Sequence, residues 1–314
     1  LVRSRGLGDV YKRQTFPFPT RYTHMAALAT AFEWGRLKMQ ASVLGYFVHE
    51  KVERFEARPD KAVATSAFFG SFKVLKNHDL SVRAFYKRMF RMPTFNDLYY
   101  TDMGNAFLKP EYAEQFNVGL KYTRNFEKSP FMRMLDVSVD AYYNKITDKI
   151  IAYPKGQQFR WTMLNLGEVE IKGVDAVLNT QFSLGKLEVT TKFQYTYQEA
   201  IDVTDPADTY YRDQIPYIPW HSGSAIIALS WGTWSLGYSF IYVGERYNQQ
   251  ENIIYNHTQP WYTSDMTLMK EIRWGKARLR FTAEVNNLFD QDYDVILNYP
   301  MPMRNYKFGL AVEL

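Results

Sequence analysis

Few residues in this sequence have the types and spacing that covalent catalysis requires. His221 and Ser222 are a base and a nucleophile, but they are neighbours in an alternating segment, so their side chains point to opposite sides of a strand. The sequence contains no nucleophile elbow, no HExxH pair and no phosphate-binding loop. Cysteine is absent, which excludes thiolate metal sites and disulfides. We therefore expect no enzyme activity, no catalytic residue, no metal site and no cofactor.

Residues suited to binding a ligand lie instead in polar segments between the alternating stretches. Loops on a rigid scaffold often carry binding residues. The ligand-binding candidates are Arg91, Tyr99, Tyr100, Arg160, Trp161, Tyr210, Tyr211 and Arg212. Each aromatic residue among them has an alternative role in packing its own loop. Arg91 and Glu111 flank one loop, either as a pair that shapes ligand entry or as a structural pair that bends the loop.

The charge of the chain is modestly positive. Lys and Arg number 38, Asp and Glu number 33, and the net charge is +5. This balance suits a basic lumen or an anionic ligand, but also an ordinary solvated surface. The sequence has no basic cluster joined to a nucleic-acid recognition motif, so we expect no nucleic-acid partner.

The elements that position the binding loops are predicted to be β-strands. In Leu187–Gln198, apolar and aromatic residues alternate strictly with polar ones, and 277–288 repeats the pattern. The polar faces of these two strands include Glu188, Lys192, Arg278, Arg280 and Glu284. No run of 18 apolar residues exists, which excludes a helical membrane span. A membrane β-barrel is compatible with such alternation, because its strands carry one apolar and one polar face.

The connections between about thirteen predicted strands alternate between short and long. Short ones lie near residues 35, 77, 128, 184, 232 and 274, and long ones near 55, 100, 158, 209, 253 and 297. The polar segment 148–167 is expected to be one of the long loops. Outer-membrane barrels have short periplasmic turns and long extracellular loops. The predicted fold is therefore all-β, an antiparallel transmembrane β-barrel wall.

Tryptophan positions support the same prediction. Six of the seven tryptophans lie beside a turn or where a long loop re-enters a strand, and only Trp161 lies inside a long loop. Indole rings prefer the membrane–water interface, so we expect two aromatic girdles.

Several motifs carry a family resemblance. They are FRMPTFNDLYY and GNAFLKPE in 90–111, NLG in 165–167, IKGVD in 171–175, NLFDQDY in 287–293 and PMPMRNYKFGL in 300–310. These segments resemble the barrel domain of TonB-dependent outer-membrane receptors. Asp175 stands where that family usually has Glu, and Leu314 stands where it commonly ends in Phe or Trp. Haem receptors of the family place a His between the first two motifs, and this chain has none there, so haem is not favoured.

The resemblance implies a 22-stranded barrel with a plugged lumen. This chain would then supply about 13 C-terminal strands, without the N-terminal plug. The implied function is active transport of a scarce small-molecule ligand, a ferric siderophore or a cobalamin-type metal chelate, across the outer membrane of a Gram-negative bacterium. Energy would come from the TonB complex, acting through the plug. The barrel would contact outer-membrane lipid, and Glu188, Lys192, Arg278, Arg280 and Glu284 would face the lumen and plug.

Two regions follow from this interpretation. Residues 1–14, LVRSRGLGDVYKRQ, resemble a translated adapter and are expected to be a non-native leader; residues 15–314 form a partial receptor barrel domain. Two other classes stay open. A passive porin would use the same strands around an open channel, and a soluble all-β binding module would pack the apolar faces against another layer. The sequence does not name the ligand.

Overall fold

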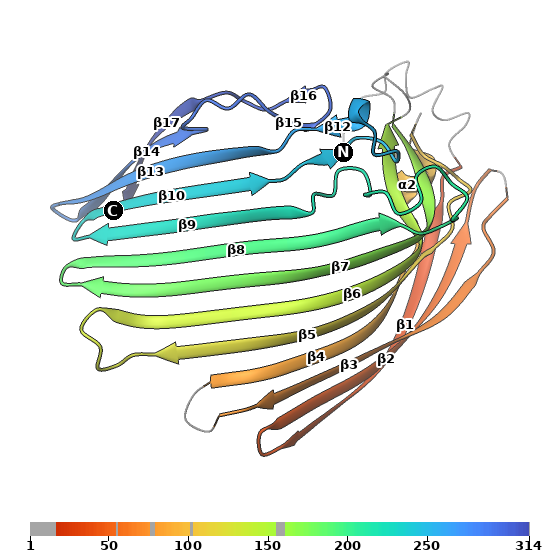
Figure 1. Ribbon diagram of the computed structural model, residues 1–314, viewed down its shortest axis with the longest axis horizontal. Helices are drawn as coiled ribbons and strands as arrows, with labels where there is room; N and C mark the ends of the chain where they lie inside the picture. Colours follow the sequence, from red (N-terminus) through yellow and green to blue (C-terminus); the bar gives the residue numbers. More distant parts are fainter. Residues whose placement is uncertain (1–16, 55, 76–78, 101–102, 155–160, 314) are drawn as a thin grey trace.

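The computed structural model describes residues 17–54, 56–75, 79–100, 103–154 and 161–313; Tyr153, Pro154 and Trp161 are described by their backbone alone. One 13-stranded antiparallel sheet dominates it (Figure 1). Its strands, in order across the sheet, are β1 (Thr20–Trp34), β2 (Leu37–Lys51), β3 (Lys61–Lys73), β4 (Asp79–Arg91), β5 (Glu111–Asn125), β6 (Met132–Pro154), β7 (Trp161–Leu184), β8 (Leu187–Asp202), β9 (His221–Trp231), β10 (Trp234–Val243), β13 (Trp261–Trp274), β14 (Ala277–Asn286) and β17 (Asn305–Glu313). Among the described residues, no helix is long and apolar enough to cross a bilayer. The predicted all-β antiparallel fold is confirmed.

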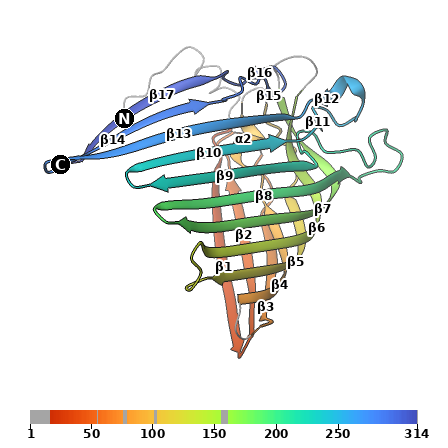
Figure 2. The same cartoon turned by 60° about the vertical axis from the view of Figure 1, so that its left-hand side comes forward.

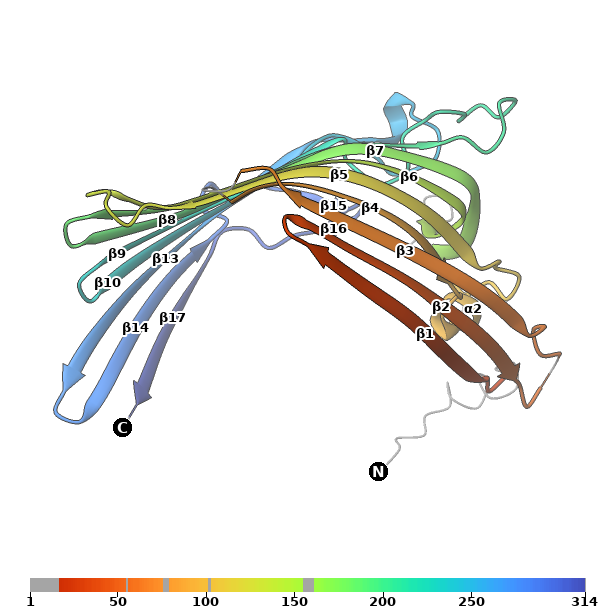
Figure 3. The same ribbon diagram turned by 90° about the horizontal axis from the view of Figure 1, so that it is seen from below.

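The sheet is a curved wall in which every strand follows its chain neighbour. Its two edges are β1 and β17, since β1 pairs with β2 and β17 pairs with β14 in the described part of the chain. Figure 3 shows the two edges apart, on either side of a concave space. Short turns lie at one end of the strands and the longer connections at the other (Figures 1 and 2). All long connections are therefore brought to the same rim.

Four of the short turns have two central residues and share one backbone conformation. Gly35, Gly185, Gly232 and Gly275 each stand first in the turn with φ near +60°, and none of the second residues has a positive φ. This is the type II′ turn, whose twist matches that of antiparallel strands. Trp34, Trp231, Trp234 and Trp274 flank three of these turns and are exposed on the sheet surface, as expected for one aromatic girdle.

The strand register sorts the side chains onto two faces. Residues directly opposite on neighbouring strands share a face, and successive residues alternate. One face carries exposed apolar side chains such as Val118, Leu120, Phe281 and Leu310. The other face is polar and lies on the concave side of the sheet. Arg21 belongs to this polar face and donates to the Pro93 carbonyl in the loop after β4, and Figure 3 shows that this loop lies on the concave side. The sheet therefore has one apolar and one polar face across all of its strands, as predicted.

The prediction of a long loop over 148–167 is wrong. Strand β6 runs on to Pro154 and β7 begins at Trp161, so most of this segment is a β-hairpin. The alternation did not reveal it, because its apolar residues, such as Ile150 and Ile151, are adjacent instead of alternating with polar ones. Asp148 has a φ of +54°, and near it the two strands bend toward the concave side (Figure 3). The hairpin therefore reaches over the polar face instead of extending straight outward.

Other long connections also contain short ordered elements that the sequence analysis did not predict. Helix α2 (Phe95–Tyr99) follows β4, and a 3-10 helix η1 covers Ile254–Asn256. Two small sheets pair β11 (Arg246–Tyr247) with β12 (His257–Thr258), and β15 (Asp294–Ile296) with β16 (Tyr299–Pro300). These elements are too short for an alternating pattern to reveal them.

Candidate ligand-binding mouth

The loop after β4 is compact because its own side chains close it. Thr94 caps α2 by accepting from the Asp97 N–H at 3.1 Å, and Asp97 Oδ2 accepts from the Thr94 N–H at 2.8 Å. This reciprocal arrangement is a capping box. Further on, the Gly104 N–H donates to the Tyr100 carbonyl at 2.7 Å, and a Cβ on Gly104 would lie 2.6 Å from the Tyr100 nitrogen. Gly104 therefore permits the chain to fold back on α2.

Arg91 holds this loop to the wall. Its Nη2 lies 3.0 Å from Asp97 Oδ2 and its Nη1 lies 3.5 Å from Glu111 Oε2. Glu111 Oε2 also accepts from the Ile150 N–H at 3.0 Å. One guanidinium thus connects the end of β4, helix α2 and the start of β5, and Glu111 extends the connection to β6. These contacts are those of a structural pair; contact between Arg91 and a ligand stays a prediction.

A second arginine fixes the same loop from the other side. Arg21 donates to Glu50 Oε1 at 2.7 Å and to the Pro93 carbonyl at 2.7 Å, and its guanidinium lies 4.9 Å from the centre of the Phe95 ring. Glu50 is only 3% exposed. The sequence analysis did not identify this cluster, because the partners are 29 and 72 residues from Arg21 and no local spacing links them.

Tyr99 packs into this loop. Its ring lies 6.2 Å from that of Phe95, and both pack against a buried cluster that includes Leu98 and Ile150. Burial raises the pKa of the Tyr99 phenol above its ordinary value, and the nearby Glu50 carboxylate raises it further. Tyr99 therefore stays protonated at neutral pH. By contrast, the adjacent Tyr100 is 59% exposed.

The bent hairpin of β6 and β7 is fastened to the α2 loop by asparagine side chains. Asn105 Nδ2 donates to the Met163 carbonyl at 3.0 Å, and the Met163 N–H donates to the Met103 carbonyl at 3.0 Å. Asn165 exchanges hydrogen bonds with the backbone of Lys109. The two connections together form one structured cover over the rim of the polar face, which we call the mouth (residues 93–100, 103–110, 148–154 and 161–167).

The other predicted ligand contacts lie elsewhere or outside the described residues. Tyr210, Tyr211 and Arg212 lie in the 203–220 connection, which Figure 3 places on the convex side, away from α2. Arg212 has a φ of +67°, and its N–H donates to the Asp202 carbonyl at 2.7 Å. Burial, with a hydrogen bond to Asp208, raises the pKa of Tyr210. Arg160 and the Trp161 side chain are outside the described residues. The structure thus brings Arg91, Tyr99 and Tyr100 together, but not the second group with them.

The five predicted lumen residues share the polar face. Following the register from β8 to β14 places Glu188, Lys192, Arg278, Arg280 and Glu284 on one side of the sheet. Glu188 accepts from Ser183 at 2.6 Å, Arg280 lies 2.8 Å from Glu271, and Glu284 lies 3.5 Å from Lys307. Contact between these five residues and a plug stays a prediction.

The polar face also carries a network on β4 to β7. Asp136 accepts from Thr123 at 2.6 Å and from Asn179 at 3.1 Å, and Arg83 pairs with Asp140 over Gly119. Alternation in 134–144 places both aspartates on the polar side, but their partners come from other strands. Among the described residues, no group of three or more His, Cys, Asp or Glu could hold a metal ion.

This architecture defines a class before any relative is considered: a curved antiparallel wall with one apolar and one polar face belongs to a membrane β-barrel. Residues 13–288 match the family "TonB dependent receptor-like, beta-barrel". The chain belongs to that family.

Individual relatives agree with this membership. The chain is 27% identical over 224 residues to the vitamin B12 transporter BtuB of Photobacterium profundum, covering 69% of this chain and 32% of that protein. It therefore spans about a third of the length of this curated relative. Two solved structures share the fold: the copper transporter OprC (TM-score 0.71, 15% identity, 94% of this chain, 48% of that one) and BauA, the ferric preacinetobactin receptor from Acinetobacter baumannii (TM-score 0.69, 15% identity, 94% and 43%).

Proposed function

We propose that this chain is part of the barrel of an outer-membrane receptor that takes up a scarce metal chelate. A ferric siderophore and a cobalamin-type compound are the two ligand classes. Membership of the TonB-dependent receptor family supports this transport role, as do relatives named for vitamin B12, copper and ferric preacinetobactin. The receptor would lie in the outer membrane of a Gram-negative bacterium, with its apolar face against lipid, and would act as a transporter rather than an enzyme.

The observation that carries the proposal is the mouth. Two connections from different parts of the chain fold over the polar face and are held there by Arg91, Arg21, Asn105 and Asn165. A receptor benefits from a preformed surface that recognises its ligand, because less ordering is then needed on binding. The rigid mouth therefore favours a receptor over a porin.

We assign the proposed ligand contacts to two kinds. Arg91 and Tyr99 are engaged in holding the mouth, so we assign them positioning roles. Tyr100 is exposed beside them and is the proposed direct contact. Tyr210, Tyr211, Arg212, Arg160 and Trp161 stay proposed contacts from other connections, which a ligand would meet only in the complete receptor.

Energy from TonB would reach the barrel through a plug held in the lumen. The polar face supports this proposal, because its guanidinium, ammonium and carboxylate groups offer hydrogen-bond partners to an inserted domain. Glu188, Lys192, Arg278, Arg280 and Glu284 are the proposed plug contacts on β8 and β14.

The test is uptake of labelled ligand by cells that express the receptor at its natural length. Labelled cyanocobalamin and a labelled ferric siderophore are supplied separately at nanomolar concentration, with and without a functional TonB. We expect saturable, TonB-dependent uptake of one of the two compounds, and weaker binding of it by a Tyr100→Ala variant. Non-saturable uptake that does not change when TonB is removed would establish the passive porin instead.

A further inference from the structure

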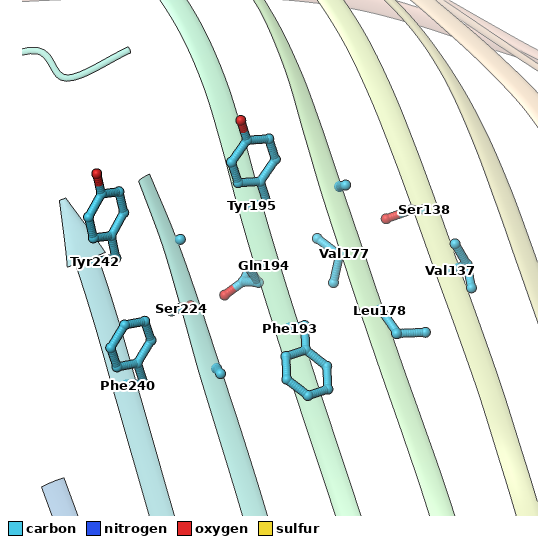
Figure 4. A pocket seen from close by; sticks show the side chains of 13 residues that line it. Val137, Ser138, Val177, Leu178, Phe193, Gln194, Tyr195, Ser224, Phe240 and Tyr242 are labelled. Atoms are coloured by element: carbon cyan, nitrogen blue, oxygen red, sulfur yellow. The ribbon is translucent and has the colours of Figure 1, made fainter. Parts of the chain in front are cut away.

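The apolar face of the sheet has a trough centred on β9. Two rows of directly paired residues cross it: Phe193, Ala225 and Phe240 form one, and Tyr195, Gly223 and Tyr242 form the other. In each row, a small residue on β9 stands between aromatic residues on β8 and β10. Figure 4 shows the four rings on their two strands, with the phenols of Tyr195 and Tyr242 both pointing toward the long-loop end.

The trough is large enough for an extended ligand. Its walls stand two strand spacings apart, about 9–10 Å. The hollow continues over Ala176 to Val137 and Leu178, and its volume is about 480 Å³. The side chains that point into it are almost entirely apolar. A hollow of this kind on a face that meets bilayer hydrocarbon would be filled by the hydrocarbon itself, so its occupant is an acyl chain.

A polar pocket adjoins the trough at its long-loop end. Tyr242 lines both, and the second pocket, of about 280 Å³, is also lined by Trp220, His221 and Glu245. His221 Nδ1 lies 2.8 Å from the Tyr195 hydroxyl. The Glu245 side chain lies 3.3 Å from His257 Nε2 and is 72% exposed. The Trp220 indole N–H is buried without a hydrogen-bond partner among the described residues.

The polar pocket has the chemistry of a site for hydroxylated groups. An indole, an imidazole and a carboxylate lie together, which combines a ring surface with hydrogen-bond donors and acceptors. It does not collect several arginines or lysines, as a site built around phosphate would. Tyr242 contributes to both parts, and amphipathic tyrosines prefer the level where hydrocarbon meets the polar headgroups.

We propose that the β8–β10 trough and its polar pocket form one glycolipid site, with an acyl chain between the aromatic rows and sugar hydroxyls against His221, Trp220 and Glu245. The site lies on the outer surface of the wall, separate from the mouth and the lumen. The inference requires that the apolar face meets the bilayer. It does not depend on which ligand the receptor transports, nor on TonB.

The experiment measures lipid retained by the receptor, purified at its natural length in mild detergent. The receptor is incubated with vesicles containing a monoglycosyl diacylglycerol and phosphatidylcholine of the same chain length, and native mass spectrometry counts the lipids bound. Ala225→Phe fills the trough, and Ala225→Leu fills it partly in case the larger residue impairs assembly. Ala283→Phe, on the same face of β14, is the matched control. Heat-modifiable gel migration verifies that each variant is a folded barrel.

We expect the unmodified receptor to retain the glycolipid at least about fivefold more than phosphatidylcholine, a preference of about 1 kcal/mol. Ala225→Phe should abolish this retention, Ala225→Leu should reduce it and Ala283→Phe should leave it unchanged. His221→Ala should remove the preference for the sugar headgroup while acyl binding persists. If the unmodified receptor and a folded Ala225→Phe variant retain equal amounts of glycolipid, the trough is not the acyl-chain site. If the unmodified receptor binds the glycolipid and phosphatidylcholine equally, the site is not specific for a glycolipid.

Discussion

Lys109 and Asn165 lie 56 residues apart and exchange two hydrogen bonds. The Lys109 N–H donates to Asn165 Oδ1 at 2.8 Å, and Asn165 Nδ2 donates back to the Lys109 carbonyl at 3.1 Å. The same amide nitrogen also donates to the Asp148 carbonyl at 2.7 Å. One asparagine therefore joins the α2 loop, β6 and β7, which explains why the chain has Asn at position 165.

Asn165→Ala should loosen the mouth. The substitution leaves backbone groups of Lys109 and Asp148 without their partner, at a cost of about 1–3 kcal/mol for each group that stays buried. Hydrogen exchange should accelerate in 103–110 and 148–152, while exchange in β9 and β10 should be unchanged. Asn125→Ala, at the opposite end of the wall, is the control. Unchanged protection of the mouth would show that packing of Leu98 and Leu108 suffices to hold it.

Arg91→Ala should be more destabilising than Arg278→Ala, although both arginines are 47% exposed in the structure. The Asp97 partner of Arg91 is 11% exposed, whereas the Glu313 partner of Arg278 is 61% exposed. Removing a cation from a buried carboxylate costs about 1–3 kcal/mol, while an exposed pair contributes less than about 1 kcal/mol.

Denaturant unfolding of the two Arg variants in detergent measures this difference. Arg91→Lys should recover part of the loss, because it restores the charge but not the planar fork that reaches two carboxylates. Equal destabilisation by Arg91→Ala and Arg278→Ala would contradict the positioning role of Arg91.

Gly167→Ala should disturb the 203–220 connection through Thr204. A Cβ at Gly167 would lie 2.3 Å from Thr204 Cγ2 and 2.9 Å from Thr204 Oγ1, and overpacking of this kind costs about 1–3 kcal/mol. Thr204→Ser removes that methyl group but keeps the hydroxyl that accepts from the Glu168 N–H at 3.0 Å. The double variant should therefore be more stable than Gly167→Ala alone.

A double-mutant cycle, with the free energy of unfolding of the four proteins, tests this coupling. Strictly additive effects would show that Gly167 is required for another reason, such as the bend at Asp148.

The mouth should loosen at alkaline pH because of Tyr99. Burial raises the pKa of this phenol in the folded protein above its unfolded value of about 10. Its contribution to stability is therefore complete below pH 10 and is lost as pH rises toward the folded pKa. Tyr99→Phe removes the titrating group, so the mouth of this variant should stay closed at higher pH.

Limited proteolysis of the mouth between pH 9 and pH 11 provides the readout, because cleavage in 103–110 reports opening. Tyr255→Phe, which replaces an exposed phenol, is the control. The same alkaline sensitivity in the Tyr99→Phe and unmodified proteins would exclude Tyr99 as its source.

Much of the wall could be predicted from sequence, because its signal is local. Alternation of period two predicted strands that begin at residues 187 and 277, where β8 and β14 begin, and the short connections predicted near residues 35 and 184 are the turns at Gly35 and Gly185. In a strand with one apolar and one polar face, successive residues alternate between apolar and polar, so the strand can be identified from a short stretch of sequence. A type II′ turn has glycine at its first central position, so it too has a local signal. The same alternation placed Glu188 and Arg280 on polar faces without any knowledge of their neighbours.

Only the tertiary structure decided how the mouth and the trough are made. The hairpin beyond Asp148 has no period-two alternation, because residues such as Ile150 and Leu166 are buried against other connections. The bonds from Arg21 to Pro93 and from Asn165 to Lys109 join segments that no spacing relates. The trough exists because strand register sets Gly223 and Ala225 between aromatic residues of two other strands. Sequence therefore determined most strands of the wall and their two faces, whereas contacts between distant segments determined where binding surfaces form.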